Sequence, residues 1–129
     1  MAWVKWNPNP SSKHVGDCTI RAITKSLDKS WEDAYCGIAL YGFMMHDLPS
    51  SNAVWGAYLR RNGFRRCILS NDCPDCYTIE DFCQEHPKGT FVVATHGHVL
   101  TVIDSNYYDS WDSGKENPIY YFEKEKKAD

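Results

Sequence analysis

The sequence predicts one α+β domain, in which helices from the first part of the chain pack on an antiparallel sheet from its last third. The chain has 129 residues, a length that suits one compact domain and is too short for two ordinary ones. Apolar residues recur at helical spacing in the first two thirds, whereas short apolar runs separated by turn residues follow. With 43% hydrophobic and 24% charged residues, the composition is that of an ordinary globular protein. We expect residues 1–122 to form the domain and residues 123–129 a charged tail.

Four helices are expected, and most have a recognisable start or end. The first follows a Gly16-Asp17 turn, in which Asp17 suits the N-cap position. The second begins at Ser30, with Asp33 in the capping-box position, and is expected to end at Gly42. The expected helical ranges are 17–27, 30–41, 51–62 and 78–86.

Strands are expected mainly in the last third of the chain. The turns His96-Gly97 and Asp104-Ser105-Asn106 join the central runs into a meander. The first 15 residues are rich in Pro, Asn and Ser and are expected to form an extended lead-in. A chain in which helices come first and a β-meander follows is typical of the α+β fold class. The expected strand ranges are 65–69, 90–95, 98–103, 107–111 and 119–122.

Charge and hydropathy argue against two classes of partner. The net charge of −3 does not suit a general nucleic-acid binder, which needs a broad basic face. A small basic cluster, Arg60-Arg61 with Arg65-Arg66, is expected to be a solvated helix end. No apolar run approaches the about 18 residues of a membrane span, and the N-terminus lacks the apolar stretch of a secretory signal. We expect a cytoplasmic protein that binds neither nucleic acid nor membranes.

Cys18 differs from the other five cysteines in its position. It falls in the first turn of an expected helix, directly after the Gly16-Asp17 turn. Backbone N–H groups and the helix dipole at that position favour a thiolate, which is the nucleophilic form of cysteine. The same N–H groups can stabilise an oxyanion. Cys18 is therefore the candidate nucleophile, and the alternative is a small buried apolar residue.

His98 is the candidate base for this nucleophile. It opens the apolar run 98–103, so its imidazole lies at the end of a strand, where a site can form. His96 is the competing base because it lies two residues away. We favour His98, because His96-Gly97 is expected to be the turn itself.

An acidic side chain after the next strand can orient the imidazole. If Asp104-Ser105-Asn106 is a three-residue turn, His98 lies directly opposite Asp112, with Cβ atoms about 4.5–5.5 Å apart. A two-residue turn would instead place Asp109 on the face of His98, because a shift of one residue reverses the faces of a strand. Asp112 is the first choice and Asp109 the alternative.

In order and element type, these residues resemble the papain-like cysteine peptidase superfamily. The resemblance rests on Gly16-Asp17-Cys18-Thr19 opening a helix, Gly97-His98-Val99 on a strand, and an acid after the following strand. The small bacterial and phage members are most similar, namely bacteriocin-leader peptidases and CHAP-type cell-wall amidases. The resemblance implies a papain-like fold, a peptide or protein substrate, and a protein of a bacterial host cell or of a phage.

The resemblance also implies a role for each residue. Cys18 would attack a carbonyl, His98 would serve as base and then as acid, and Asp112 would orient His98. A thioester acyl-enzyme would form and then be resolved by water or an amine. The sequence departs from the superfamily at one position, because no Gln precedes Cys18. Asn9 or Asn7 is the candidate to donate to the oxyanion instead, if the lead-in folds back over the site.

Two other functions compete with a peptidase. One is a CHAP-like cell-wall amidase, against which stands the absence of an export signal. The other is a non-catalytic papain-fold module that binds a partner, which the missing Gln favours. The sequence indicates no cofactor and does not indicate an oligomeric state.

The remaining cysteines allow several interpretations. Cys36 and Cys83 are expected in the core. Cys67, Cys73 and Cys76 remain open between free thiols, a labile disulfide, a redox pair and, together with Cys83, a zinc site. The spacing matches no common zinc pattern, so we expect no metal.

Overall fold

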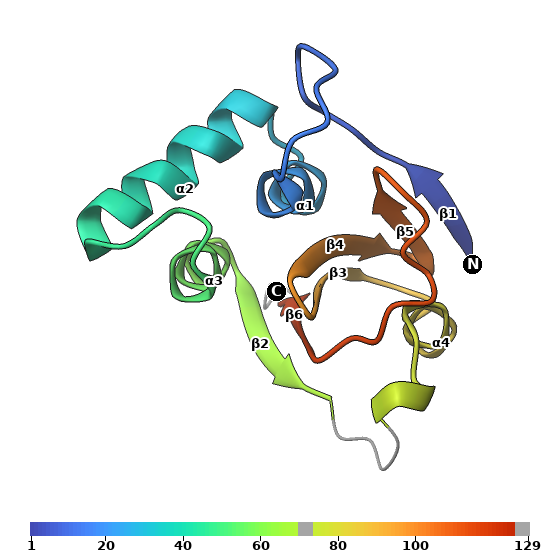
Figure 1. Cartoon of the computed structure of the whole chain (residues 1–129). Coiled ribbons are helices and arrows are strands. Elements are labelled where there is room, and N and C mark those ends of the chain that lie inside the picture. The colour runs from blue at the N-terminus through green and yellow to red at the C-terminus, as the bar shows by residue number, and fades with distance from the viewer. Residues whose placement is uncertain (70–73, 126–129) are drawn as a thin grey trace.

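The computed structural model describes residues 1–69 and 74–125 (Figure 1). The fold is α+β, as the sequence predicts, with helices followed by a six-stranded sheet. Its elements are β1 (Ala2–Lys5), α1 (Cys18–Leu27), α2 (Trp31–Met45), α3 (Asn52–Arg61), β2 (Phe64–Ile68), the 3-10 turn η1 (Pro74–Cys76), α4 (Ile79–Glu85), β3 (Thr90–Thr95), β4 (His98–Ile103), β5 (Asn106–Asp109) and β6 (Tyr120–Lys124).

The sheet is mixed rather than purely antiparallel. Its strand order is β1-β5-β4-β3-β6-β2, and β1 pairs with β5 in parallel while the other neighbours are antiparallel. The expected lead-in therefore contributes an edge strand that the sequence analysis did not predict. The backbone N–H of Trp6 donates to the carbonyl of Asp109 at 2.8 Å, which extends this pairing to the end of β5.

The sheet separates two apolar cores, and Figure 1 shows α1 and α4 on its opposite sides. Alternate residues of β3 explain the division, because neighbouring side chains on a strand point to opposite faces. Val92 and Ala94 pack in the core formed with α1, α2 and α3. Phe91 and Val93 pack in the core formed with α4. Helix α1 lies against β4, where the Thr101 hydroxyl donates to the Ala22 carbonyl at 2.7 Å.

The turn between β4 and β5 has two residues instead of the expected three. Ile103 pairs with Asn106, and the turn residues Asp104 and Ser105 have φ angles of 48° and 72°. Two successive left-handed residues suit a tight hairpin turn. Side-chain hydrogen bonds hold the turn, since the Asp104 carboxylate accepts from the Gly89 N–H and the Ser105 hydroxyl donates to the Cys83 carbonyl. The prediction of a three-residue turn was therefore wrong.

Two further boundaries differ from the prediction. Helix α2 continues through Gly42 to Met45, and a Cβ atom at residue 42 would lie 2.9 Å from the carbonyl oxygen of Asp47. Gly42 thus permits a close approach of the following chain instead of ending the helix. Strand β6 includes Glu123 and Lys124, which were expected in the tail, while residues 126–129 lie outside the described residues. Within the described part of the chain, no helix has the length and apolar character needed to cross a membrane.

Candidate active site

Cys18 is the first residue of α1 and is half-buried. Its backbone N–H lies in the first turn of the helix, where no intrahelical acceptor exists. Burial raises the pKa of the Cys18 thiol and is the largest single cause. The hydrogen bonds from His98 and the Val99 backbone, together with the charges of His98 and Arg21, outweigh it and lower the pKa. The net effect is a Cys18 pKa below the ordinary value.

His98 opens β4 directly opposite Thr95 and lies beside Cys18. Its Nε2 atom is 2.5 Å from Oδ2 of Asp109, which leaves Nδ1 as the ring nitrogen for Cys18. Burial lowers the pKa of His98, but the hydrogen bonds and charges of Asp109 and Cys18 raise it to about 9. His96, the competing base, lies in the exposed turn. The structure brings together Cys18 and His98, as expected.

Asp109, and not Asp112, holds the imidazole. Asp109 is 2% exposed, and its Oδ2 also accepts a hydrogen bond from the Ser113 hydroxyl at 2.7 Å. Asp112 is exposed and accepts from the Tyr107 hydroxyl and from the Gly114 N–H. The preference for Asp112 was therefore wrong, and the alternative, Asp109, is the acid beside His98. The reason is that the two-residue turn shifts the register of β5 by one residue.

Arg21 connects helix α1 to the Asp109 carboxylate, and this connection was not predicted from the sequence. Its guanidinium forms ion pairs with Asp17 and, at 3.5 Å, with Oδ1 of Asp109. Asp17 stands at the N-cap of α1 without a side-chain cap hydrogen bond, and its Oδ2 accepts from the Trp31 indole N–H at 2.9 Å. Arg21 lies one turn after Cys18 and is 8% exposed. The four-residue spacing from Asp17, which brings opposite charges together on a helix, was the signal that could have revealed it.

An open cleft of about 370 Å³ surrounds the thiol. Trp111 forms one wall, with its ring centroid 5.1 Å from that of His98. Asn7 lines the cleft, so it is better placed than Asn9 to donate to an oxyanion. The Asn9 side-chain oxygen instead accepts from the Ser11 and Lys13 N–H groups. The lining residues are Asn7, Lys13, His14, Val15, Gly16, Cys18, Arg21, Gly97, His98, Ser110 and Trp111.

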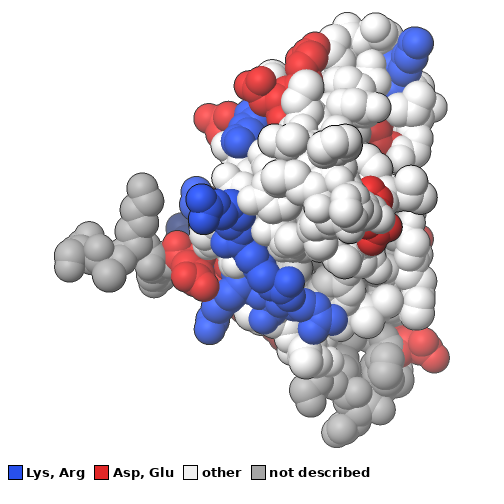
Figure 2. Space-filling view, turned by 90° about the vertical axis from the view of Figure 1, so that its left-hand side faces the viewer, with Lys and Arg blue, Asp and Glu red and all other residues white. Residues whose placement is uncertain are grey.

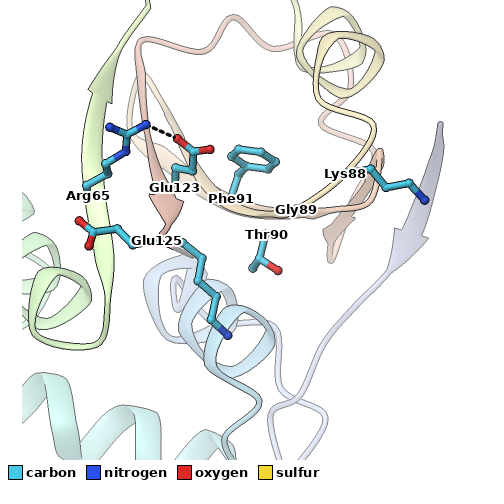
Figure 3. Close-up of a pocket in the computed structure, with 8 residues that line it drawn as sticks. Arg65, Lys88, Gly89, Thr90, Phe91, Glu123 and Glu125 are labelled. Atoms are coloured by element: carbon cyan, nitrogen blue, oxygen red, sulfur yellow. Dashed lines mark hydrogen bonds and ion pairs between the residues drawn. The ribbon is translucent and has the colours of Figure 1, made fainter. Parts of the chain in front are cut away.

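A larger cavity, of about 720 Å³, lies at the other end of the sheet. It is bounded by the start of β3 and the end of β6, whereas His98 adjoins the end of β3. Figure 3 shows the Arg65–Glu123 ion pair, at 2.9 Å, across one side of it. Its lining holds charges of both signs and no cysteine or histidine. The candidate nucleophile Cys18 and the candidate base His98 both line the smaller cleft.

The basic cluster around the end of α3 and β2 is exposed, as expected for a solvated surface. Arg60, Arg61, Arg65 and Arg66 are all exposed. Figure 2 shows Lys and Arg side chains gathered on the face turned toward the viewer, next to acidic side chains. This cluster does not contribute to the cleft around Cys18.

The other cysteines differ in their surroundings. Cys83 is fully buried, as expected, and burial raises its pKa to about 11. Cys36 is exposed, so the expectation of a core position was wrong, because it lies on the outer side of α2. Cys67 is a half-buried free thiol and Cys76 is disulfide-bonded, while Cys73 lies outside the described residues. Among the residues that the structure describes, no group of three or more His, Cys, Asp or Glu side chains could hold a metal ion.

Comparisons with known proteins do not identify the chain. No protein-family model matches it. No curated protein and no solved structure is significantly similar to it.

Proposed function

We propose that the chain is a papain-like cysteine hydrolase that cleaves an amide or isopeptide bond of a peptide or protein. The observation that carries the proposal is the hydrogen-bonded series Cys18–His98–Asp109 at the edge of an open cleft. A nucleophile, a base and an orienting acid in this relation form the arrangement used in acyl transfer. The nucleophile opens a helix and the base opens a later strand, which is the order of these groups along the chain in papain-like peptidases.

The two pKa shifts support a thiolate–imidazolium pair at rest. The pKa of Cys18 is lowered and that of His98 is raised to about 9, and both shifts favour the state in which the proton resides on His98. Asp109 stabilises the imidazolium and fixes the ring, with its other oxygen held by the Ser110 N–H at 2.8 Å. This is the state in which cysteine is a ready nucleophile.

The reaction follows from these positions. Sγ of Cys18 attacks the substrate carbonyl, and the resulting oxyanion faces the backbone N–H of Cys18. His98 donates its proton to the leaving amine as the carbon–nitrogen bond breaks, which leaves a thioester. His98 then removes a proton from water, and the hydroxide attacks the thioester. The acid is released, and the proton on His98 restores the imidazolium beside the Cys18 thiolate.

A partner-binding module of the same fold is the second candidate, and one observation favours it. The side-chain amide that lines the cleft, that of Asn7, donates to the Lys13 carbonyl at 3.3 Å. An oxyanion would compete for this donor, which is a weaker arrangement than a free side-chain amide. A binding module would retain the cleft without turnover.

Hydrolysis of a mixed peptide pool distinguishes the two candidates. The pool is incubated with the wild-type chain and with Cys18→Ala, and new peptide ends are read by mass spectrometry. The hydrolase proposal predicts new ends that depend on Cys18. Cys36→Ala is the control, because Cys36 is an exposed free thiol outside the cleft. Equal cleavage, or none, by wild-type and Cys18→Ala would contradict the proposal.

A further inference from the structure

Among the residues that the structure describes, the lining of the candidate cleft contains basic side chains and no carboxylate. Apart from His98, the titratable side chains of the lining are those of Lys13, His14, Cys18 and Arg21. The chain as a whole is acidic, with 17 Asp and Glu against 14 Lys and Arg. The charge of the cleft lining is therefore opposite to that of the whole molecule.

The two carboxylates nearest to the cleft do not cancel this charge at its surface. Asp17 and Asp109 are 6% and 2% exposed, and neither lines the cleft. Asp17 binds Arg21 and Trp31, and Asp109 binds His98, Arg21, Ser110 and Ser113. These buried carboxylates pair with Arg21 and His98 beneath the cleft lining, and neither of them forms an ion pair with Lys13.

The loop that carries Lys13 is held by its own hydrogen bonds. The Asn9 side-chain oxygen accepts from the N–H groups of Ser11 and Lys13, at 2.9 and 3.4 Å. The Asn7 side-chain amide donates to the Lys13 carbonyl. These contacts help to hold Lys13 and His14 in the lining of the cleft that also contains His98. Lys13 is exposed and forms no ion pair with any residue that the structure describes.

We infer that the cleft selects an acidic acyl group, in which a carboxylate lies next to the carbonyl that Cys18 attacks. The substrate class is a peptide with Asp or Glu beside the scissile bond, and this inference rests on the proposed function. Lys13 attracts the carboxylate from the rim. Val15 and Trp111, which are 46% and 43% exposed, offer apolar surface to the aliphatic part of the same residue.

Alkylation by two small reagents, one negatively charged and one neutral, tests the inference without requiring turnover. Iodoacetate carries the carboxylate, whereas iodoacetamide is its neutral counterpart. The rate of modification at Cys18 is measured for each at low ionic strength by peptide mapping. The expected result is that Lys13→Gln lowers the iodoacetate-to-iodoacetamide rate ratio by about fivefold, because one positive charge near the thiol is lost. His98 attracts iodoacetate as well, but equally in both proteins.

Lys88→Gln is the matched control, because Lys88 is exposed and lines only the distant cavity. It should leave the ratio unchanged. A ratio that is the same in wild-type and Lys13→Gln, or that falls equally in Lys88→Gln, would overturn the inference. If Cys18 reacts slowly with both reagents but the rate ratio still depends on Lys13, the hydrolase proposal is contradicted. The inference that the cleft selects a negatively charged group would still hold.

A peptide competitor extends the test to the proposed substrate class. N-acetyl-Ala-Glu-Ala-amide is expected to slow the reaction of Cys18 with iodoacetamide more than its glutamine analogue does. The difference should disappear in Lys13→Gln and persist in Lys88→Gln. Equal protection of the wild-type by the two peptides would contradict the selection of an acidic residue.

Discussion

At the scale of single residues, the protonation states of Cys18 and His98 determine what the cleft can do. Alkylation of Cys18 requires only the thiolate, whereas amide hydrolysis also requires the proton on His98. The pKa of Cys18 lies below its ordinary value, and that of His98 lies near 9. The two reactions should therefore respond differently to alkaline pH.

The pH profiles of alkylation and hydrolysis test this difference. Both rates should rise together as the Cys18 thiol loses its proton, at a lower pH than an ordinary cysteine thiol requires. Hydrolysis should then fall above about pH 9, as His98 loses its proton, while alkylation should not fall. An alkylation profile of Cys18 identical to that of Cys36 would be incompatible with the thiolate–imidazolium pair.

Two neighbouring carboxylates provide a matched comparison at the same scale. Asp109→Asn removes the charge that stabilises the His98 imidazolium, so the alkaline limit of hydrolysis should move to lower pH and kcat/KM should fall by about a hundredfold or more. Asp112→Asn changes an exposed carboxylate that binds Tyr107 and Gly114, so it should have little effect on either quantity. Steady-state kinetics over a range of pH provides the measurement, and equal effects of the two variants would contradict the assignment of Asp109.

At the scale of elements, the site depends on how α1 sits against β4 and β5. Arg21 connects the N-cap residue Asp17 on the helix side with Asp109 at the end of β5. The charge of its buried guanidinium also contributes to lowering the pKa of Cys18. Arg21 is thus a positioning residue, which acts through the groups it holds.

Arg21→Gln should raise the pH at which Cys18 becomes reactive and lower the rate of hydrolysis by about tenfold or more. Arg21→Lys, which retains the charge but offers fewer donors, should give an intermediate profile. Thr101→Val is the control, because it removes a buried hydrogen bond between α1 and β4 without touching the ion pairs. The alkylation profile of Cys18 is measured in folded protein, as checked by circular dichroism. An unchanged profile in both Arg21 variants would restrict Arg21 to a structural role.

Local sequence signals predicted the elements well, but not their exact pairing. Turn and cap residues such as Gly16 and Ser30 located the helices, because they act within a few positions of the chain. The register of β5 depended on whether Asn106 belongs to the turn or to the strand. Gly89, just before β3, and Cys83 of α4 hydrogen-bond to Asp104 and Ser105 and so stabilise the two-residue turn. Such contacts cannot be predicted from the residues near the turn. A one-residue error was enough to exchange Asp109 for Asp112.

At the scale of the whole molecule, the chain brings a cysteine from near its N-terminus to a histidine and an aspartate from its last third. The sequence order of these groups and their element types were predictable, since each lies at an element boundary. The parallel pairing of β1 with β5 and the ion pair between Arg21 and Asp109 were not, because they join segments about 90 to 100 residues apart. Both support the end of β5, where Asp109 lies.

The formation of an acyl-enzyme on Cys18 tests the central claim most directly. The protein is mixed with p-nitrophenyl acetate at neutral pH, where the thiolate–imidazolium pair is expected, and the release of p-nitrophenol and the intact mass are followed together. The account predicts a rapid release of about one equivalent, with an acetyl group on Cys18 that water then removes. Cys18→Ser should lack the rapid phase, and Asp109→Asn should slow it. A rapid phase that persists in Cys18→Ser, or an acetyl group found mainly on Cys36, would contradict the account.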